Sequence, residues 1–450
     1  MPGRMEPGGA VELAVRFAEE MGAGEAEAYA ERMHGVSATV NAGAVRSVEA
    51  FSDEGIGVRV VVDGGTGFAY ATGLDEKSIR IAVEEALRAA RAAPRDPYAG
   101  LPFPRGRRPA SIEGIYSARL ATIEPGMVVE RLVELVEEAR GHGLETPYAS
   151  IEVVAATVAV ANSHGVGAQT SETWAGMDAG LTPGRGVPPI SVYESSKTML
   201  PEAEPLVEKA EAIASACRSV VRLDQPRRMP VVLAPPALAP MLHETLLAAV
   251  NASMIARGRS PYRGKLGELV VSEKLTIIDD PHMPGGDAST PFDAEGVPTA
   301  RKPLIEKGVL RSIVSDEYWG RRIGMGSTGN AVRGGYSSQP YPSTFNVVVE
   351  PGDAGSEELL EGSEVLYVYE VRGAHTIRTE TGEYSLLAAP AILYRGGEPV
   401  GVVKGAMIAG VMYADLASRV EMVGRRVEHP APACYMPALR LGGVMVASQE

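Results

Sequence analysis

Cysteine is nearly absent from this sequence, because its 450 residues include only Cys217 and Cys434. Two cysteines cannot form a framework of disulfides, and free thiols of this kind are usually small core residues in a reducing compartment. No stretch approaches the roughly 18 consecutive apolar residues of a membrane span. Residues 1–10 also contain no apolar run of signal-peptide length. We therefore expect a cytoplasmic protein that does not enter a membrane.

Clustered basic charge is missing as well. The chain has 43 Lys and Arg against 57 Asp and Glu, for a formal net charge of -14. The one dense basic stretch, at residues 105–108, lies among prolines and is typical of a linker. Because phosphate binding needs clustered Lys and Arg, the composition argues against direct contact with nucleic acid.

Several catalytic signatures are absent too. The sequence contains no G-x-S-x-G nucleophile elbow, no G-x-x-x-x-G-K phosphate loop and no pair of histidines at H-x-H or i,i+4 spacing. Residues 324–329 fit the G-x-G-x-x-G pattern of dinucleotide-binding proteins, and Glu350 follows about 20 residues later. The pattern should follow a strand and open a helix, whereas residues 318–323 are expected to be helical and residues 331–342 to form a loop. Nucleotide binding is therefore rejected.

The periodicity of the N-terminal half predicts the same series of elements twice. Apolar residues at helical spacing predict helices near 11–21, 75–92, 127–140 and 202–220, and alternating patterns predict strands at 55–63, 68–71, 151–161, 166–177 and 190–198. A proline-rich segment over 94–109 separates the two series. The order of elements indicates a duplicated helix and β-hairpin unit.

The C-terminal half is predicted to be rich in strands. A short strand at 230–234 and a helix from Pro236 to Asn251 come first, followed by strands at 269–278, 345–350, 365–371, 384–394 and 439–447. A chain of this length exceeds one hydrophobic core. We expect an α+β protein with domains at 1–105, 110–222 and 228–450, of which the last is β-rich.

His243 and Glu244, on the predicted 236–251 helix, are the first candidates for chemistry. Zinc peptidases place two histidines about one turn apart so that both bind one metal, while the intervening Glu polarises water. Here Leu247 stands four residues after His243, and Ala248 stands five after it. One imidazole cannot replace three protein ligands. The pattern favours a helix histidine that is satisfied by a neighbour over a tight metal site.

Acidic residues gather at 279–295, where Asp279, Asp280, Asp287, Asp293 and Glu295 surround a Pro-Gly-Gly turn. Their spacing does not match an EF-hand loop, so we expect solvated turn residues there. His375 is close in sequence to two glutamates and could face a cleft.

Several segments together resemble the TldD/PmbA family, also named modulator of DNA gyrase. The order of these segments is kept along nearly the whole chain, and the block at 288–296 is the most specific of them. The segments that carry the resemblance are 55–60, 67–69, 96–98, 101–102, 280–283, 288–296, 304–310, 327–330, 373–376, 381–385 and 423–424.

The resemblance implies an α+β N-terminal portion, a β-rich C-terminal portion and a dimer enclosing a cavity in which an unfolded peptide is cut. One branch of the family, TldD, carries an H-E-x-x-x-H helix and a later cysteine as metal ligands. The other, PmbA or TldE, lacks them and pairs with the first to form the peptidase. His243 and Glu244 match the start of that motif, but Ala248 occupies the place of its second histidine. Cys434 lacks the Gly-rich stretch that follows the ligand cysteine in TldD proteins.

On this basis we expect a metal-free PmbA/TldE-type subunit of a heteromeric peptidase, with zinc or another divalent metal in a TldD-like partner. His243 and Glu244 are the catalytic candidates, as vestiges of the motif. Candidates for peptide binding are Ser327, Thr328, Gly329, Asn330 and His375.

Two alternatives stay open. One is a peptidase active alone, as a homodimer, that uses His243 and Glu244 with Cys434 or His375. The other is a regulator that binds gyrase or a related protein.

Overall fold

The computed structural model describes residues 5–448 except 105, 107, 185 and 218. The 105–108 segment predicted as a linker lies in part outside the described residues. Among the described residues, no helix is both long and apolar enough to cross a bilayer.

The N-terminal half forms one curved, antiparallel, six-stranded sheet with the strand order β3-β2-β1-β4-β5-β6. Each half of this sheet follows the order helix, three strands, helix, and the two halves meet where β1 pairs with β4. The elements are α1 (Pro7–Glu20), β1 (Glu25–Asn41), β2 (Ala44–Val62), β3 (Gly65–Thr72), α2 (Glu76–Ala92), α3 (Ala118–Ala121), α4 (Pro125–Gly141), β4 (Glu145–Asn162), β5 (Gly167–Thr182), β6 (Ile190–Ser196) and α5 (Glu204–Ala216).

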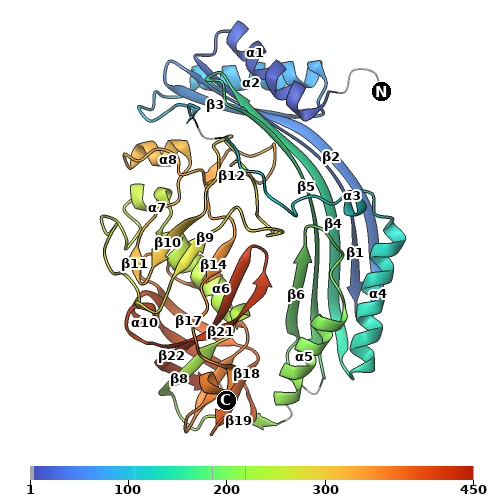
Figure 1. The fold of residues 1–450 in the computed structure, drawn as a ribbon, viewed down its shortest axis with the longest axis vertical. Helices are drawn as coiled ribbons and strands as arrows, with labels where there is room; N and C mark the ends of the chain where they lie inside the picture. Colours follow the sequence, from blue (N-terminus) through green and yellow to red (C-terminus); the bar gives the residue numbers. More distant parts are fainter. Residues whose placement is uncertain (1–4, 105, 107, 185, 218, 449–450) are drawn as a thin grey trace.

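The helices pack on one face of this sheet because its strands alternate between two kinds of surface. Ala26, Ala28 and Ala30 of β1 pack with α1 and α2, while Val36 and Ala38 on the same face pack with α4 and α5. Small residues under α1 and α2 let those helices lie close to the strands. Figure 1 shows α1, α2 and α4 on the outer side of the curved sheet and the C-terminal half within its concave side.

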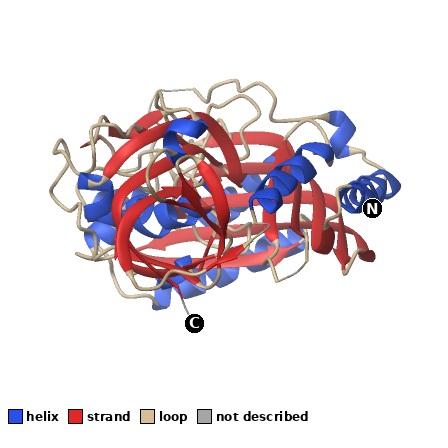
Figure 2. Ribbon diagram, turned by 90° about the horizontal axis from the view of Figure 1, so that it is seen from below, coloured by secondary structure: helices blue, strands red, loops and turns tan. Residues whose placement is uncertain are grey.

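The C-terminal half is built around a fourteen-stranded mixed sheet in which β22 pairs with four other strands. Strands outnumber helices in this half, and the helices among them are short. Figure 2 shows the strands, helices and loops of the whole molecule from below. Its elements are β7 (Val220–Val221), β8 (Arg227–Leu233), α6 (Pro235–Leu242), η1 (His243–Leu247), α7 (Ala252–Ala256), β9 (Ile277–Asp279), β10 (Lys302–Glu306), β11 (Val309–Leu310), α8 (Glu317–Arg322), β12 (Ala331–Val332), β13 (Tyr341–Pro342), β14 (Val347–Val349), α9 (Ser356–Leu360), β15 (Val365–Val368), β16 (Val371–Arg372), η2 (Ala374–Thr376), β17 (Glu383–Ala388), β18 (Ala391–Arg395), β19 (Glu398–Val403), β20 (Ala406–Val411), α10 (Met412–Ser418), β21 (Val420–Ala431) and β22 (Cys434–Ser448).

The α+β class, with helix and hairpin units followed by a strand-rich C-terminal part, is confirmed. The domain boundaries stay a prediction, and the structure adds that the first two predicted units share one sheet.

Two predicted strands are wrong. Within 269–278 only the last residues are extended, because Val271 and Leu275 enter the core from turns. The 384–394 strand is two strands, β17 and β18, separated at Pro390, which has no N–H to donate to a ladder.

Gly67 marks the closest approach of a helix to the sheet. A Cβ added there would lie 2.0 Å from the carbonyl oxygen of Ala86 and 2.3 Å from the nitrogen of Ala90, both in α2. We expect Gly67→Ala to lower the free energy of unfolding by about 1–3 kcal/mol, because backbone atoms must move apart. Gly9→Ala in α1 is the matched control, since a Cβ there meets nothing within 4 Å. It should leave stability unchanged or raise it by up to about 1 kcal/mol. Equal urea midpoints for the two variants would contradict the packing described.

Candidate functional site

The candidate site begins at the end of α6, where the helix changes from α-helical to π-helical. The chain enters α6 through Pro235 and Pro236 and passes Pro240, which has no N–H for the helical ladder. Thr245 donates its hydroxyl hydrogen to the carbonyl of Met241 at 2.6 Å. The five residues from His243 onward then form a single π-helical turn, η1. Such turns are rare and are found frequently at functional sites.

This π turn decides which positions lie side by side. In a regular α-helix, residues five apart point about 140° away from each other. In a π turn the hydrogen bonds join residues five apart and bring them to neighbouring positions on one face. We therefore expect His243 and Ala248 to lie nearer to one face than they would in an α-helix, as the two histidines of an H-E-x-x-x-H motif require. His243 is exposed, whereas Glu244 and Ala248 are half-buried.

His243 and Glu244 line a cleft of about 460 Å³ between the C-terminal half and the six-stranded sheet, which we call the histidine cleft. Cys434, the other residue compared with the family's ligands, lines the same cleft. The full set of lining residues is Tyr148, Asp178, Ala179, Ser191, Val192, Tyr193, Pro236, Ala239, Pro240, His243, Glu244, Glu370, Val371, Pro430, Ala431, Pro432 and Cys434. The structure thus brings Cys434 to the same cleft as His243 and Glu244, which precede it by about 190 residues.

The wall opposite α6 comes from the sheet. Tyr148 and Asp178 project from the neighbouring strands β4 and β5, and Tyr193 from β6, the last strand of that sheet. Asp178 and Glu370 add two carboxyl groups to that of Glu244, and the described lining residues include no Lys or Arg. Burial raises the pKa of Glu370. The cleft therefore combines an acidic, partly aromatic surface with the edge strand of a sheet.

Asp287 holds the hairpin that carries Cys434 against β6. Its carboxylate accepts hydrogen bonds from the Ser195 hydroxyl at 2.6 Å, the Tyr193 hydroxyl at 3.2 Å and the Ala433 N–H at 3.1 Å. His429 Nε2 lies 3.0 Å from the same carboxylate. Burial raises the pKa of Asp287, but the hydrogen bonds from His429 and Ser195 outweigh it, and the pKa lies below its usual value. A charged Asp287 therefore links the sheet to the β21–β22 hairpin.

The donor set of the histidine cleft does not fit a catalytic divalent metal. Such a site takes three protein ligands, and Ala248 offers a methyl group where a second imidazole is needed. A ligand cysteine must be a thiolate, whereas burial and the charge of Asp287 raise the pKa of Cys434 to about 11. In the described part of the chain, no three His, Cys, Asp or Glu side chains gather as a metal site would require. The expectation that this chain holds no metal stays a prediction.

The segment proposed for peptide binding, residues 327–330, is largely internal. Ser327 and Asn330 are buried, and Thr328 is half-buried. Asn330 donates to Asp279 at 2.7 Å and to the Ser343 carbonyl at 3.0 Å. These contacts tie the segment to β9 and give its polar side chains a structural role. A part in peptide binding stays a prediction.

His375 lies apart from these residues. It is exposed in η2 and is not among the residues that line the histidine cleft. The structure therefore does not bring it together with His243, and its role in peptide binding also stays a prediction.

The acidic run at 279–295 was expected to be solvated, and for four of its members this is wrong, among them Asp287, whose side chain is 6% exposed. Asp279, Asp293 and Glu295 are no more than 1% exposed. Each has partners that sequence spacing does not reveal. Glu295 accepts from Arg59 at 2.7 Å, and Asp293 accepts from three backbone N–H groups. The Glu295–Arg59 ion pair links the C-terminal half to the six-stranded sheet.

These buried acids predict how stability depends on pH. Burial and the nearby charge of Glu295 raise the pKa of Asp293 to about 8 and that of Asp316 to about 7. A carboxyl group with a raised pKa binds more protons in the folded state, so the free energy of unfolding should fall as the pH rises from about 4 to about 8. Urea unfolding at a series of pH values measures this slope.

Asp316→Asn provides the control for that slope. Asp316 caps α8 by accepting from the Trp319 N–H at 2.7 Å, and Asn can make the same bond. The variant should fold and show a shallower loss of stability around pH 7. A slope identical to that of the wild type would show that Asp316 does not titrate as described.

Comparison with known proteins identifies the class of protein to which this fold belongs. Residues 226–448 match the PmbA/TldA metallopeptidase C-terminal domain, and residues 26–90 match domain 1 of the same metallopeptidases. The chain therefore belongs to the PmbA/TldD metallopeptidase family.

Three relatives show how far the similarity extends. The crystal structure of TldE from Thermococcus kodakarensis is similar with a TM-score of 0.91 and 26% identity, and covers 98% of this chain and 100% of that one. Metalloprotease PmbA of Escherichia coli O157:H7 is 27% identical over 93% of this chain and 92% of its own. The TldD homolog of Haemophilus influenzae is 28% identical, over 44% of this chain and 41% of its own.

Proposed function

We propose that this chain is the metal-free, PmbA/TldE-type subunit of a heteromeric metallopeptidase that cleaves unfolded peptides or small proteins. The observation that supports this most is the π turn of η1. It keeps the backbone geometry that would place two histidines side by side, yet position 248 carries alanine. The chain thus has the frame of a metallopeptidase site with a single imidazole, and the metal that activates water belongs to a TldD-like partner.

The histidine cleft suits this role because one of its walls is an edge strand. β6 pairs with β5 on one side only, and Ser191, Val192 and Tyr193 of β6 line the cleft. An unfolded chain can add to such an edge through backbone hydrogen bonds, which tolerate many side-chain sequences. This subunit would then supply peptide-binding surface while its partner supplies the metal.

Co-purification from native lysate tests the proposal. A tagged version of this chain should retain, in about equal amount, a related chain that carries the intact H-E-x-x-x-H helix. Recovery of homodimers alone, with full peptidase activity, would contradict it.

A peptidase active alone is the second candidate, because His243, Glu244 and Cys434 line one cleft. Metal analysis of the purified protein and of His243→Ala discriminates the two. A stoichiometric transition metal that is lost in the variant would favour the second candidate, and no retained metal in either protein would favour the first.

A further inference from the structure

One edge of the six-stranded sheet is covered over only part of its length. β2 pairs with β1 along its whole length, but β3 pairs only with its second part, residues 55–62. The first part, residues 44–54, has no other strand beside it in the described part of the chain. Most of its residues are exposed, among them Val45 at 40% and Val48 at 45%. This stretch, which we call the open edge, is roughly 36 Å long at 3.3 Å per residue.

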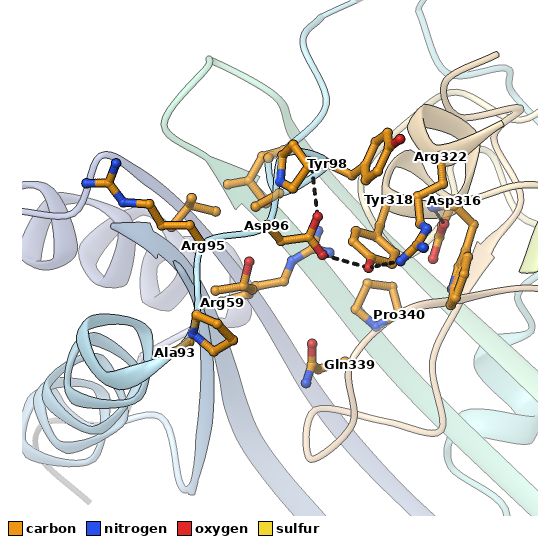
Figure 3. A pocket seen from close by; sticks show the side chains of 18 residues that line it. Arg59, Ala93, Arg95, Asp96, Tyr98, Asp316, Tyr318, Arg322, Gln339 and Pro340 are labelled. Atoms are coloured by element: carbon orange, nitrogen blue, oxygen red, sulfur yellow. Dashed lines mark hydrogen bonds between the residues drawn. The ribbon is translucent and has the colours of Figure 1, made fainter. Parts of the chain in front are cut away.

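The covered part of the same edge shows the contrast. The segment that follows α2 returns to the start of β3, where Asp96 donates its N–H to the Gly64 carbonyl at 2.9 Å. The Asp96 carboxylate accepts from the Tyr318 hydroxyl at 2.8 Å, beside a cavity of about 630 Å³ between the two halves of the chain (Figure 3). At residues 47–53, by contrast, no backbone hydrogen bond arrives from any described segment outside the β1–β2 pair.

The register of the sheet shows which backbone groups of the open edge point outward. The Gly73 N–H donates to the Glu54 carbonyl at 2.8 Å, so the backbone groups of residue 54 point away from β1. In a strand the N–H and C=O of one residue point to the same side, and this side alternates along the strand. The β1–β2 pairing is regular over this stretch. The N–H and C=O groups of Ser52, Ala50 and Val48 therefore point away from the sheet.

These outward groups fit those of a second copy of the chain. If two open edges meet antiparallel with Ala50 opposite Ala50, then Val48 lies opposite Ser52, and every outward N–H meets a carbonyl. Centring the pair on residue 49 would instead bring two Glu49 side chains face to face, and centring it on residue 51 would bring Glu49 opposite Asp53. Like charges directly opposite each other destabilise a sheet. The pairing centred on Ala50 avoids both.

The open edge also lacks common protections against pairing. Natural edge strands often carry Lys or Pro, contain a bulge or lie under a loop. Residues 47–53 contain neither Lys nor Pro. The irregularity in the β1–β2 pairing lies between Thr39 and Val40 of β1, beyond the end of this stretch. A long, regular and exposed edge of this kind can pair with another strand.

We propose that the open edge is a self-association surface, where a second copy adds its own residues 47–53 antiparallel, centred on Ala50. The two six-stranded sheets then form one continuous sheet. The two-fold axis through Ala50 is perpendicular to this sheet, so both C-terminal halves lie on the same side of it. No residue of the open edge lines the histidine cleft. The surface is therefore independent of the proposed peptidase role.

Sedimentation equilibrium of the isolated full chain tests the proposal without a partner or a metal. A pairing over residues 47–53 is small for a protein interface, so we expect a dissociation constant on the order of 10–100 µM. Ala50→Pro removes an outward N–H and leaves the β1 pairing intact, since proline is accepted on the free side of an edge strand. This variant should associate at least tenfold more weakly, whereas Ala50→Ser, which keeps the N–H, should associate like the wild type.

Salt gives a second measurement on the same samples. Glu49 and Asp53 lie on the same face of the joined sheet in both copies, so their repulsion should be screened and the association should become severalfold tighter between 0.05 and 0.5 M salt, on the order of the change in screening length. A wild type that stays monomeric, or an association that Ala50→Pro leaves unchanged, would overturn the proposal.

Cysteine variants report the register and do not depend on the folding of Ala50→Pro. Facing residues of a hydrogen-bonded antiparallel pair have Cα atoms about 5.5 Å apart, a separation that a disulfide can span. Under mild oxidation Ala50→Cys should cross-link to itself. Val48→Cys should cross-link to Ser52→Cys in a mixture, but neither should cross-link to itself. The wild type, which has Cys217 and Cys434, is the control.

Two results of the cross-linking would overturn the proposal. One is a folded Ala50→Cys protein that forms no more intermolecular disulfide than the wild type. The other is cross-linking of this variant to a TldD-like chain in place of a second copy, which would assign the open edge to that chain.

Discussion

Ala248→His is expected to give the isolated chain a firmly held divalent metal. His243 and Cys434 line the same cleft, and from the π turn we expect position 248 to lie beside His243, so the new imidazole would complete a set of two histidines and one thiolate. Three protein ligands with an open fourth position are what a catalytic zinc site requires. Metal content should rise from far below one to about one zinc per chain, as measured on protein loaded with zinc and then desalted.

Two features identify this metal as the predicted one. His243→Ala in the Ala248→His background should remove it, and Ala248→Gln, of similar size, should not bind it. Because Cys434 must lose a proton that its raised pKa of about 11 retains, the affinity should increase with pH. A folded Ala248→His protein without metal would show that η1 does not bring positions 243 and 248 together.

Cleavage of unfolded peptides is expected to require a second chain. Alone, this protein should show no cleavage that a chelator abolishes. With a TldD-like chain from the same cell, activity should rise by several orders of magnitude, because metal-bound water is the nucleophile. Fluorogenic unfolded peptides measure the rate in each mixture.

The matched controls lie in this chain. His243→Ala and Glu244→Gln should lower the activity of the mixture no more than severalfold, since both residues line the proposed peptide-binding cleft but neither holds the metal in the proposed complex. The equivalent changes in the partner's H-E-x-x-x-H helix should abolish it. A large loss with His243→Ala in this chain would place catalysis here and refute the subunit proposal.

The sequence predicted the layout of the first 222 residues well, because amphipathic helices and hairpins have strong local periods. It missed β1 entirely. The start of that strand, rich in Ala and Glu, has no β-branched residue before Val36. It is extended because it pairs with β2 over its whole length and with β4 from Glu27 onward. Pairing partners that are distant in sequence decided this element.

The site was predictable only in part. His243 and Glu244 stand out as a motif fragment, and the family resemblance singled out Ala248 and Cys434. Nothing in the residues themselves indicated the π turn, which follows Pro240 of α6 and includes Thr245. Similarly, Glu295 looked solvated because Arg59, its counter-charge, is more than 200 residues away. Burial of a charged pair is a tertiary property that spacing along the chain does not encode.

The most direct measurement for the account as a whole is the metal content of the isolated wild-type chain, determined after zinc loading and desalting, with peptide cleavage assayed on the same sample. One imidazole in the cleft predicts far less than one zinc per chain and no cleavage. One firmly held zinc per chain, together with cleavage that a chelator abolishes, would contradict it.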